Sequence, residues 1–170
     1  MKITFEPIGV VHSPFTELSN MPIQPTGDAA AAGTLEIYPP FCEALADLDG
    51  FSHIYVLYYF HKISGWQPKV IPFLDNQPHG LFATRAPRRP NPIGLSLLQI
   101  TAVEGCQIMV SGLDILDGTP LLDIKPYIPQ FEDPQNIRNG WLGERGDQVK
   151  SRKSDHRFLK SDNHDPHRLV

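Results

Sequence analysis

The stretch that decides the fold covers residues 94–113, GLSLLQITAVEGCQIMVSGL. Two runs rich in β-branched and aliphatic residues, 94–103 and 106–113, flank the dipeptide Glu104-Gly105. A short connection with glycine between two such runs is typical of a β-hairpin, whose strands are antiparallel. The stretch therefore predicts a sheet in which consecutive strands pair in opposite directions.

Further strand-like runs lie on both sides of this hairpin. Residues 53–60, HIYVLYYF, are rich in aromatic and β-branched residues, which is typical of a central strand. The other runs predicted as strands are residues 3–12, 34–38, 80–84 and 121–127. One helix is predicted over about residues 41–48, after Pro39-Pro40 and before Gly50. Strands without intervening helices favour an antiparallel barrel or sandwich over a doubly wound sheet.

The length and composition of the chain suit one globular domain. It has 170 residues, 41% of them hydrophobic, which is enough for a single core. It contains no apolar run of 18 residues, so no transmembrane helix is predicted. The start, MKITFE, shows neither a charged and apolar leader nor a cleavage site, so we expect a cytoplasmic protein. The seventeen prolines favour short strands joined by shaped loops.

The two cysteines, Cys42 and Cys106, lie far apart in the sequence and form no CxxC pair. Disulfides are rare in cytoplasmic proteins, and metal sites need closely spaced ligands. We therefore expect both cysteines to be reduced packing residues.

Charge is distributed unevenly, although the formal net charge is only −4. Residues 1–60 hold one lysine against seven acidic residues, whereas residues 141–170 hold seven basic and five acidic residues. This balance disfavours a general nucleic-acid coat protein and places any RNA partner on the second half of the chain.

The regular spacing of apolar residues fades late in the chain. Residues 1–145 are predicted as the folded domain and residues 146–170 as a polar, mobile tail.

The densest candidate for binding chemistry is residues 80–96, GLFATRAPRRPNPIGLS. Its prolines fix the loop in an extended shape, which lowers the entropy lost when a ligand binds. Arg85, Arg88 and Arg89 can each grip a carboxylate or phosphate with two parallel hydrogen bonds. The alternative is a solvated loop on the rim of a barrel, but the flanking apolar strands and the prolines favour a ligand-facing loop.

A second segment, residues 117–129, reads DGTPLLDIKPYIP. Asp-Gly is a turn dipeptide, so residues 117–120 present a run of backbone amides and carbonyls at the start of a strand. Asp123 and Lys125 lie two residues apart on one face of that strand, where they either act on a ligand or pair as ions.

Two weaker candidates are His61-Lys62, at the end of the aromatic strand, and MPIQP at residues 21–25. The chain lacks a GxGxxG after a strand, a Walker A sequence, an HExxH and a GxSxG, which disfavours the site types that these motifs build. His156, His164 and His167 alternate with acidic residues, and we interpret them as a solvated charge run. No metal site is predicted.

The segments GLFATRAPRRPNPIGLS and DGTPLLDIKPYIP together resemble the TsaA-like (TrmO) family of tRNA methyltransferases. Supporting matches are IGVVHSPF near the start, MPIQP, GFSHIYVLYYFHK at residues 50–62 and a glycine-tryptophan-proline pattern from Gly65. The resemblance runs in order from about residue 5 to about residue 143.

The resemblance implies a single small antiparallel β-barrel with one or two short helices, and a homodimer. It also implies binding of S-adenosylmethionine and methylation of N6 of threonylcarbamoyladenosine beside the tRNA anticodon. The cofactor contacts carried over by position are Pro22, Ile23, Gln24, His61, Lys62, Arg85, Leu95, Asp117, Gly118, Thr119 and Pro120.

Two departures from the family pattern limit this transfer. Longer members have Pro-Arg-Gln where this chain has Pro22-Ile23-Gln24, and they carry a C-terminal domain where this short form has a polar tail. The residues expected to meet RNA are Arg88, Arg89 and Lys125, and the candidates for the catalytic base are Asp117 and Asp123. Two alternatives stay open: a regulatory protein that binds S-adenosylmethionine, and a methyltransferase that acts on a small molecule.

Overall fold

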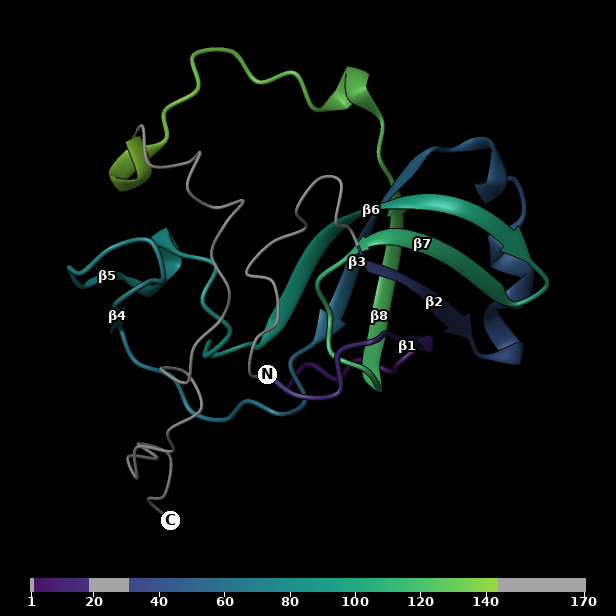
Figure 1. Ribbon diagram of the computed structural model, residues 1–170, viewed down its shortest axis with the longest axis horizontal. Coiled ribbons are helices and arrows are strands. Elements are labelled where there is room, and N and C mark those ends of the chain that lie inside the picture. The colour runs from purple at the N-terminus through teal and green to yellow at the C-terminus, as the bar shows by residue number, and fades with distance from the viewer. Residues whose placement is uncertain (1, 19–30, 144–170) are drawn as a thin grey trace.

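A computed structural model describes residues 2–18 and 31–143 of the chain. Its main body is a closed barrel of six antiparallel strands (Figure 1). The strands are β1 (Gly9–His12), β2 (Ala31–Ile37), β3 (His53–Tyr59), β6 (Ile93–Glu104), β7 (Gln107–Leu113) and β8 (Thr119–Pro126). Around the barrel they follow the order β1-β2-β7-β6-β3-β8, and β1 pairs with β8 to close the ring. The predicted mainly β fold is confirmed, as a barrel.

The hairpin predicted from residues 94–113 is the longest part of this barrel. β6 and β7 meet at a tight turn in which Glu104 pairs with Gln107, and Gly105 takes the positive φ of 59° that favours glycine. Because successive side chains of a strand point to opposite faces, every second side chain faces the core. The largest fully buried side chains are Leu35, Ile54, Leu98, Ile108, Leu113, Ile115, Leu121, Val11, Val56 and Val110.

The other predicted strands are found with shifted bounds, and one prediction is wrong. β1 covers only residues 9–12, β2 begins earlier than expected at Ala31, and β8 begins at Thr119. Residues 80–84 do not form a strand. Only the short β5 (His79–Gly80) is extended there, paired with β4 (Lys69–Val70), and Leu81–Ala83 forms a 3-10 turn. The Thr84 hydroxyl donates to the Leu81 carbonyl at 2.8 Å, and this local bond competes with a strand.

The predicted helix is present as 3-10 helix. It covers Pro39–Leu45, and a second 3-10 turn covers Leu48–Gly50. Ala46 between them is extended and Asp47 has a φ of 65°, so the two segments cannot join into a longer α-helix. A further 3-10 turn, Pro129–Phe131, follows β8.

The expectation of reduced cysteines is wrong, because Cys42 and Cys106 form a disulfide. The pairing of β2 with β7 brings the chain that leaves β2 against the turn between β6 and β7. The Ile37 amide donates to the Cys106 carbonyl at 2.8 Å, and the Cα atoms of the two cysteines lie 5.0 Å apart. Sequence separation alone could not show this proximity. The disulfide also removes one of the arguments for a cytoplasmic location.

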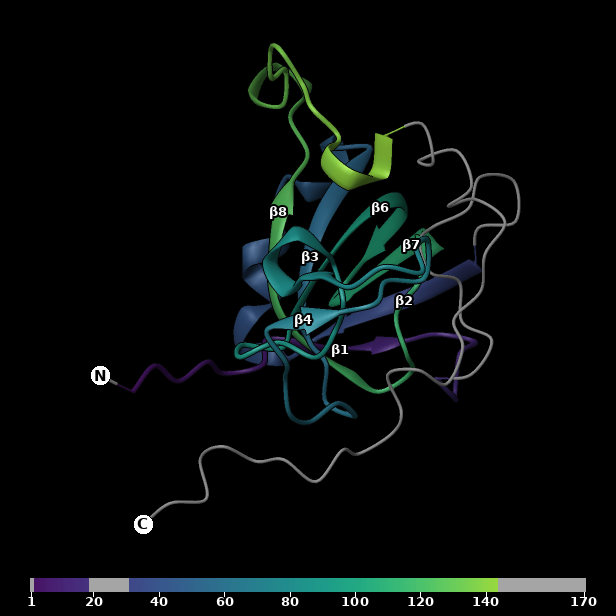
Figure 2. The ribbon, with the colours of Figure 1, turned by 90° about the vertical axis from the view of Figure 1, so that its left-hand side faces the viewer.

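After β8 the chain leaves the barrel, arches away and returns to the lobe formed by β4 and β5 (Figures 1 and 2). We call residues 127–143 the arch. Its end is fixed by Trp141, whose indole Nε1 donates to the Ala83 carbonyl at 2.7 Å. The same ring stacks on His79, with 4.3 Å between ring centroids. The predicted tail, residues 146–170, lies outside the described residues.

Candidate functional site

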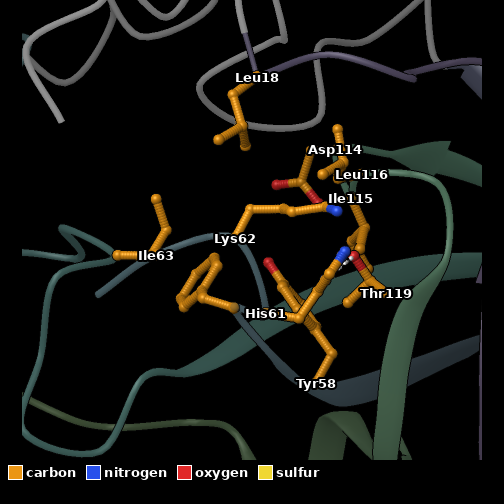
Figure 3. A pocket seen from close by; sticks show the side chains of 10 residues that line it. Leu18, Tyr58, His61, Lys62, Ile63, Asp114, Ile115, Leu116 and Thr119 are labelled. Carbon is orange, nitrogen blue, oxygen red and sulfur yellow. Dashed lines mark hydrogen bonds between the residues drawn. The ribbon is translucent and has the colours of Figure 1, made fainter. Parts of the chain in front are cut away.

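A small pocket of about 50 Å³ opens at the end of the barrel where β3 finishes and β8 begins (Figure 3). Its walls come from β3 and the residues after it, from the segment between β7 and β8, and from the end of the first described stretch. The lining residues are Leu18, Tyr58, Phe60, His61, Lys62, Ile63, Asp114, Ile115, Leu116 and Thr119. An apolar wall with a few convergent polar groups is typical of a small-molecule site.

Two pocket residues, Tyr58 and Asp114, are joined through the buried Ser96 into a chain of three polar side chains. Ser96 Oγ donates to Asp114 Oδ1 at 2.7 Å, and the Tyr58 hydroxyl lies 3.2 Å from the same Ser96 oxygen. Since the Ser96 proton is directed to Asp114, Tyr58 is the donor in the second bond. The chain links β3, β6 and the segment that follows β7, so it fixes the Asp114 carboxylate relative to the barrel.

Burial shifts both acidic groups of this chain. Desolvation raises the pKa of Asp114 from 3.8 to about 6, although the Ser96 hydrogen bond and the charge of Arg85 oppose the shift. The pKa of Tyr58 is raised well above its usual 10.0, first by burial and then by the nearby Asp114 charge. Tyr58 therefore stays protonated, while Asp114 titrates close to neutral pH.

Two features of the sheet position Tyr58. The register of β3 against β8 shifts after Leu57, so Leu57 pairs with Asp123 and Tyr58 with Leu121, leaving Leu122 out of the pairing. Such bulges redirect side chains and occur often beside active sites. On the other side Tyr58 pairs with Gly94 of β6, where a β-carbon would collide with the tyrosine ring. Glycine at 94 is therefore required by the ring.

The turn predicted at residues 117–120 is present beside the pocket. Gly118 has a φ of 72°, and Thr119 Oγ1 lies 3.5 Å from His61 Nδ1 (Figure 3). Asp117 itself binds the first described stretch: its Oδ1 accepts the Ser13 amide at 2.9 Å, and its amide donates to the Phe15 carbonyl at 2.7 Å. The Asp117 carboxylate thus holds backbone rather than facing the pocket. Pro120 pairs with Val10 of β1.

His61 and Lys62 both line the pocket, as the family resemblance implies for a ligand site. Burial and then the charge of Lys62 lower the pKa of His61, which keeps its imidazole neutral at neutral pH. Lys62 is exposed, and its side chain extends over the pocket on the Asp114 side in Figure 3.

The three predicted arginines have different surroundings. Arg85 is exposed, and its charge lowers the pKa of both Asp114 and Tyr58, so it lies within electrostatic reach of the pocket. Arg89 supports its own loop: one guanidinium nitrogen donates to the Thr84 carbonyl at 2.9 Å, and the group lies over the Phe82 ring at 5.7 Å. Arg88 is half-buried in the same loop.

Leu95, Asp123 and Lys125 are not among the pocket residues. Leu95 points outward from β6, on the face opposite to Ser96, and is 49% exposed. Lys125 Nζ lies 2.7 Å from Asp123 Oδ2, so these two side chains pair as ions, one of the two alternatives left open by the sequence. Pro22, Ile23 and Gln24 lie outside the described residues, as do the histidines after residue 143.

Sequence reasoning missed the Tyr58–Ser96–Asp114 chain. A signal for Asp114 does exist, because it stands alone in the apolar run Leu113–Leu116, where a carboxylate is either buried or bound. Ser96 gives no comparable signal.

Within residues 2–18 and 31–143, no group of three His, Cys, Asp or Glu side chains is placed to hold a metal ion. Among the same residues, no helix is long and apolar enough to cross a membrane.

A closed antiparallel barrel with a polar and apolar pocket at its mouth defines a small-ligand-binding β-barrel. Residues 10–133 match the family model described as the tRNA-methyltransferase O N-terminal domain. This match covers most of the chain, and the chain belongs to that family.

Two relatives illustrate what the chain is similar to. A probable S-adenosyl-L-methionine-binding protein of Pyrococcus abyssi is 44% identical over 159 residues, which cover 94% of this chain and 86% of the relative. The tRNA (adenine(37)-N6)-methyltransferase of Escherichia coli is 41% identical over 138 residues, covering 75% of this chain and 59% of the enzyme.

The crystal structure of TrmO from Pseudomonas aeruginosa superimposes with a TM-score of 0.69 at 42% identity. The superposition covers 83% of this chain and 63% of that one. The chain therefore spans less than two thirds of the length of these two bacterial relatives.

Proposed function

We propose that this protein transfers the methyl group of S-adenosylmethionine to N6 of an adenosine in tRNA. The observation that carries the proposal is the pocket at the barrel mouth, where the Asp117–Pro120 turn adjoins the Tyr58–Ser96–Asp114 chain. Family membership and the activity of the Escherichia coli relative support the same reaction. A tRNA substrate also favours a cytoplasmic location.

The described residues offer S-adenosylmethionine part of a site. The enclosed pocket is only about 50 Å³, so most of the ligand would lie outside it, and Leu18, Ile115 and Leu116 offer an apolar wall. His61, Lys62 and the 117–120 turn offer hydrogen-bonding groups around that wall. Pro22, Ile23 and Gln24 stay proposed contacts, and so does Leu95, which faces outward from β6 and would touch only a ligand held by a second copy of the chain. When bound, the molecule supplies an electrophilic methyl group. The protein then has to hold the target nitrogen in line with that methyl group and exclude water.

The finer substrate that we propose is N6 of threonylcarbamoyladenosine beside the anticodon. This nucleoside carries a carboxylate, and Arg85 is the exposed arginine whose charge reaches the pocket. Its guanidinium can bind either that carboxylate or the methionine carboxylate of the cofactor with two hydrogen bonds. Arg85→Ala should weaken binding of the affected ligand by roughly 1.5–3 kcal/mol. Arg138→Ala on the exposed arch is the matched control.

For tRNA docking we propose Arg88, Arg89 and Lys125. Arg89 has spare N–H groups beyond the nitrogen that binds its own loop, and Lys125 is exposed, so both can still meet phosphates. Binding should weaken with salt, with a slope of about 0.7–0.9 per phosphate contact. Replacing Arg88 and Arg89 by alanine should flatten this slope and slow methylation of tRNA. An unchanged slope would place the RNA on another surface.

We also propose a homodimer formed through the outer face of β3 and β6. Leu95, Leu97 and Tyr59 on this face are 49%, 38% and 41% exposed, and they flank the half-buried Tyr55 and Leu57. An apolar face of this kind is self-complementary across a twofold axis. Light scattering should give twice the 19.1 kDa of the chain, and Leu97→Glu should reduce the mass to one chain. A single-chain mass for the unaltered protein at micromolar concentration would contradict the dimer.

The decisive experiment uses the full chain, S-adenosylmethionine and an anticodon stem-loop that carries threonylcarbamoyladenosine. Mass spectrometry of the digested nucleosides should show one added methyl group on that nucleoside and none on a stem-loop with plain adenosine. The relative from Pyrococcus abyssi is named only as a binding protein, so a second outcome is specified. Tight binding of S-adenosylmethionine without transfer to any tRNA would favour a regulatory protein or a small-molecule methyltransferase.

A further inference from the structure

We propose that Asp114 takes the proton from N6 as the adenosine is methylated, with Ser96 and Tyr58 holding its carboxylate in place. This inference rests on the proposed function and adds the base that the reaction needs. N6 of threonylcarbamoyladenosine is a poor nucleophile, because its lone pair is delocalised into the ring and the adjacent carbonyl. Removing the N6 proton as the new bond forms therefore lowers the barrier.

The step balances without a further reactant. N6 forms a bond to the methyl carbon, and the bond between that carbon and sulfur breaks with its electron pair left on sulfur. The N6–H bond breaks with its electron pair left on nitrogen, and the proton passes to a carboxylate oxygen of Asp114. The sulfonium becomes a neutral thioether, and its positive charge is balanced by the proton released from N6. Asp114 gives this proton to water after the product has dissociated.

The geometry gives Asp114 free acceptor capacity inside the pocket. A carboxylate has two oxygens and about four acceptor sites, of which the Ser96 hydroxyl uses one, on Oδ1, at 2.7 Å. Tyr58 is buried and binds Ser96 in turn at 3.2 Å, so the carboxylate cannot turn freely. A base held by two successive hydrogen bonds is the arrangement that proton transfer at a fixed point requires.

The electrostatic surroundings suit a base that works at neutral pH. The titratable and charged groups that face Asp114 are Tyr58 from β3, His61 and Lys62 after β3, and Arg85 before β6. Burial raises the pKa of Asp114 to about 6, so the group is ionised at neutral pH and still binds a proton more strongly than an ordinary aspartate. The charge of Arg85 favours the ionised form.

The other acidic candidates are placed less well. The Asp117 carboxylate accepts a backbone amide of Ser13, and Asp123 pairs with Lys125 on the outer face of the barrel. His61 is the remaining competitor, because it lines the pocket and is neutral. Its Nδ1 lies 3.5 Å from the Thr119 hydroxyl, which directs that nitrogen to the 117–120 turn.

The test measures single-turnover methylation of the modified stem-loop across pH for the wild type, Asp114→Asn and Ser96→Ala. Asp114→Asn should lower the rate roughly 10²- to 10⁴-fold and abolish the acid limb of the profile. Ser96→Ala should move that limb to higher pH, because the Ser96 hydrogen bond lowers the pKa of Asp114. Glu104→Gln, an exposed acid at the opposite end of the barrel, should change neither.

A second readout needs no turnover. Carbon-13 NMR of the unliganded protein should show one aspartate carboxyl that titrates well above the others and is absent in Asp114→Asn. Calorimetry with S-adenosylhomocysteine should show affinity within about threefold of the wild type for that variant, which separates proton transfer from ligand binding. Wild-type rates in Asp114→Asn would overturn the inference and leave the proposed function standing. If the acid limb of the pH profile persists in Asp114→Asn but vanishes in His61→Gln, the base is His61 and the inference is overturned as well. An inactive wild type would overturn both.

Discussion

The Tyr58 ring on β3 packs against the backbone of Gly94 on β6 so closely that a β-carbon at position 94 would clash with the ring carbons. Gly94→Ala must therefore push Tyr58 away and break its hydrogen bond to Ser96. We expect this variant to lose about 1–3 kcal/mol of unfolding free energy, as overpacked cores do. Urea unfolding measures the loss.

Gly80→Ala is the matched control for this substitution. Gly80 has an ordinary φ of −56°, and no atom lies within 4 Å of the position that its β-carbon would take. Its stability should stay within about 0.5 kcal/mol of the wild type. Equal stabilities for the two variants would contradict the close packing of Tyr58.

The stability of the protein should depend on pH through Asp114. Burial raises its pKa in the folded state to about 6 from 3.8, so between about pH 4 and 6 the folded state binds a proton that the unfolded chain has released. Stability from this group is therefore present at low pH and is lost as pH rises through that window. Asp114→Asn removes the effect. It should gain on the order of 2–3 kcal/mol relative to wild type between pH 4 and 7.5.

Urea unfolding of both proteins at several pH values checks this prediction. The difference between the two free energies is the relevant quantity, because it cancels the contributions of the other carboxylates. A difference that stays constant from pH 4 to 7.5 would mean that Asp114 titrates alike in the folded and unfolded states.

The sequence could predict the barrel because strand composition and hairpin signals are local. Residues 53–60 and 94–113 are rich in aromatic, aliphatic and β-branched residues, and they become β3, β6 and β7 with bounds within about a residue of those predicted. Residues 80–84 are wrongly predicted as a strand, because Leu81–Ala83 forms a 3-10 turn that the Thr84 hydroxyl stabilises by its bond to the Leu81 carbonyl. Such a bond leaves no periodic trace in the sequence.

The site could be predicted only in part, and for a related reason. His61, Lys62 and Thr119 are pocket residues that the motifs identified, since each stands at the end of a strand. The Ser96–Asp114 bond instead joins β6 to the segment that follows β7, and nothing in the sequence pairs these two residues. The Cys42–Cys106 disulfide was missed in the same way, because strand order and not sequence separation brings the two together.

The disulfide should contribute to stability through the unfolded chain. It closes a loop with a sequence separation of 64, for which loop entropy predicts a contribution of about 4 kcal/mol. Replacing Cys42 and Cys106 by serine should lower the urea midpoint of unfolding, and wild type in reductant should unfold at the same midpoint as this variant. A reductant that leaves the wild-type midpoint unchanged would contradict the bond. Binding of S-adenosylhomocysteine should persist, because the cysteines lie at the end of the barrel away from the pocket.

Trp141 should control whether the arch stays docked. Its indole donates to the Ala83 carbonyl at 2.7 Å and stacks on His79, which in turn binds Asp75 at 3.0 Å, whereas the middle of the arch is exposed. Trp141→Ala removes both contacts, so amide hydrogens of residues 127–143 should exchange faster while those of the barrel strands are unchanged. Trp141→Phe keeps a stacking ring and loses the hydrogen bond, and its exchange should be intermediate.

Ile137→Ala is the matched control for Trp141→Ala, because Ile137 belongs to the arch but is 71% exposed. It should leave the exchange of the arch at the wild-type rate. Hydrogen exchange followed by mass spectrometry compares the four proteins under one condition. If Trp141→Ala exchanges no faster than Ile137→Ala, the arch is held by contacts other than the indole. If the barrel strands exchange faster as well, docking of the arch and stability of the barrel are coupled, and Trp141 acts on the whole fold.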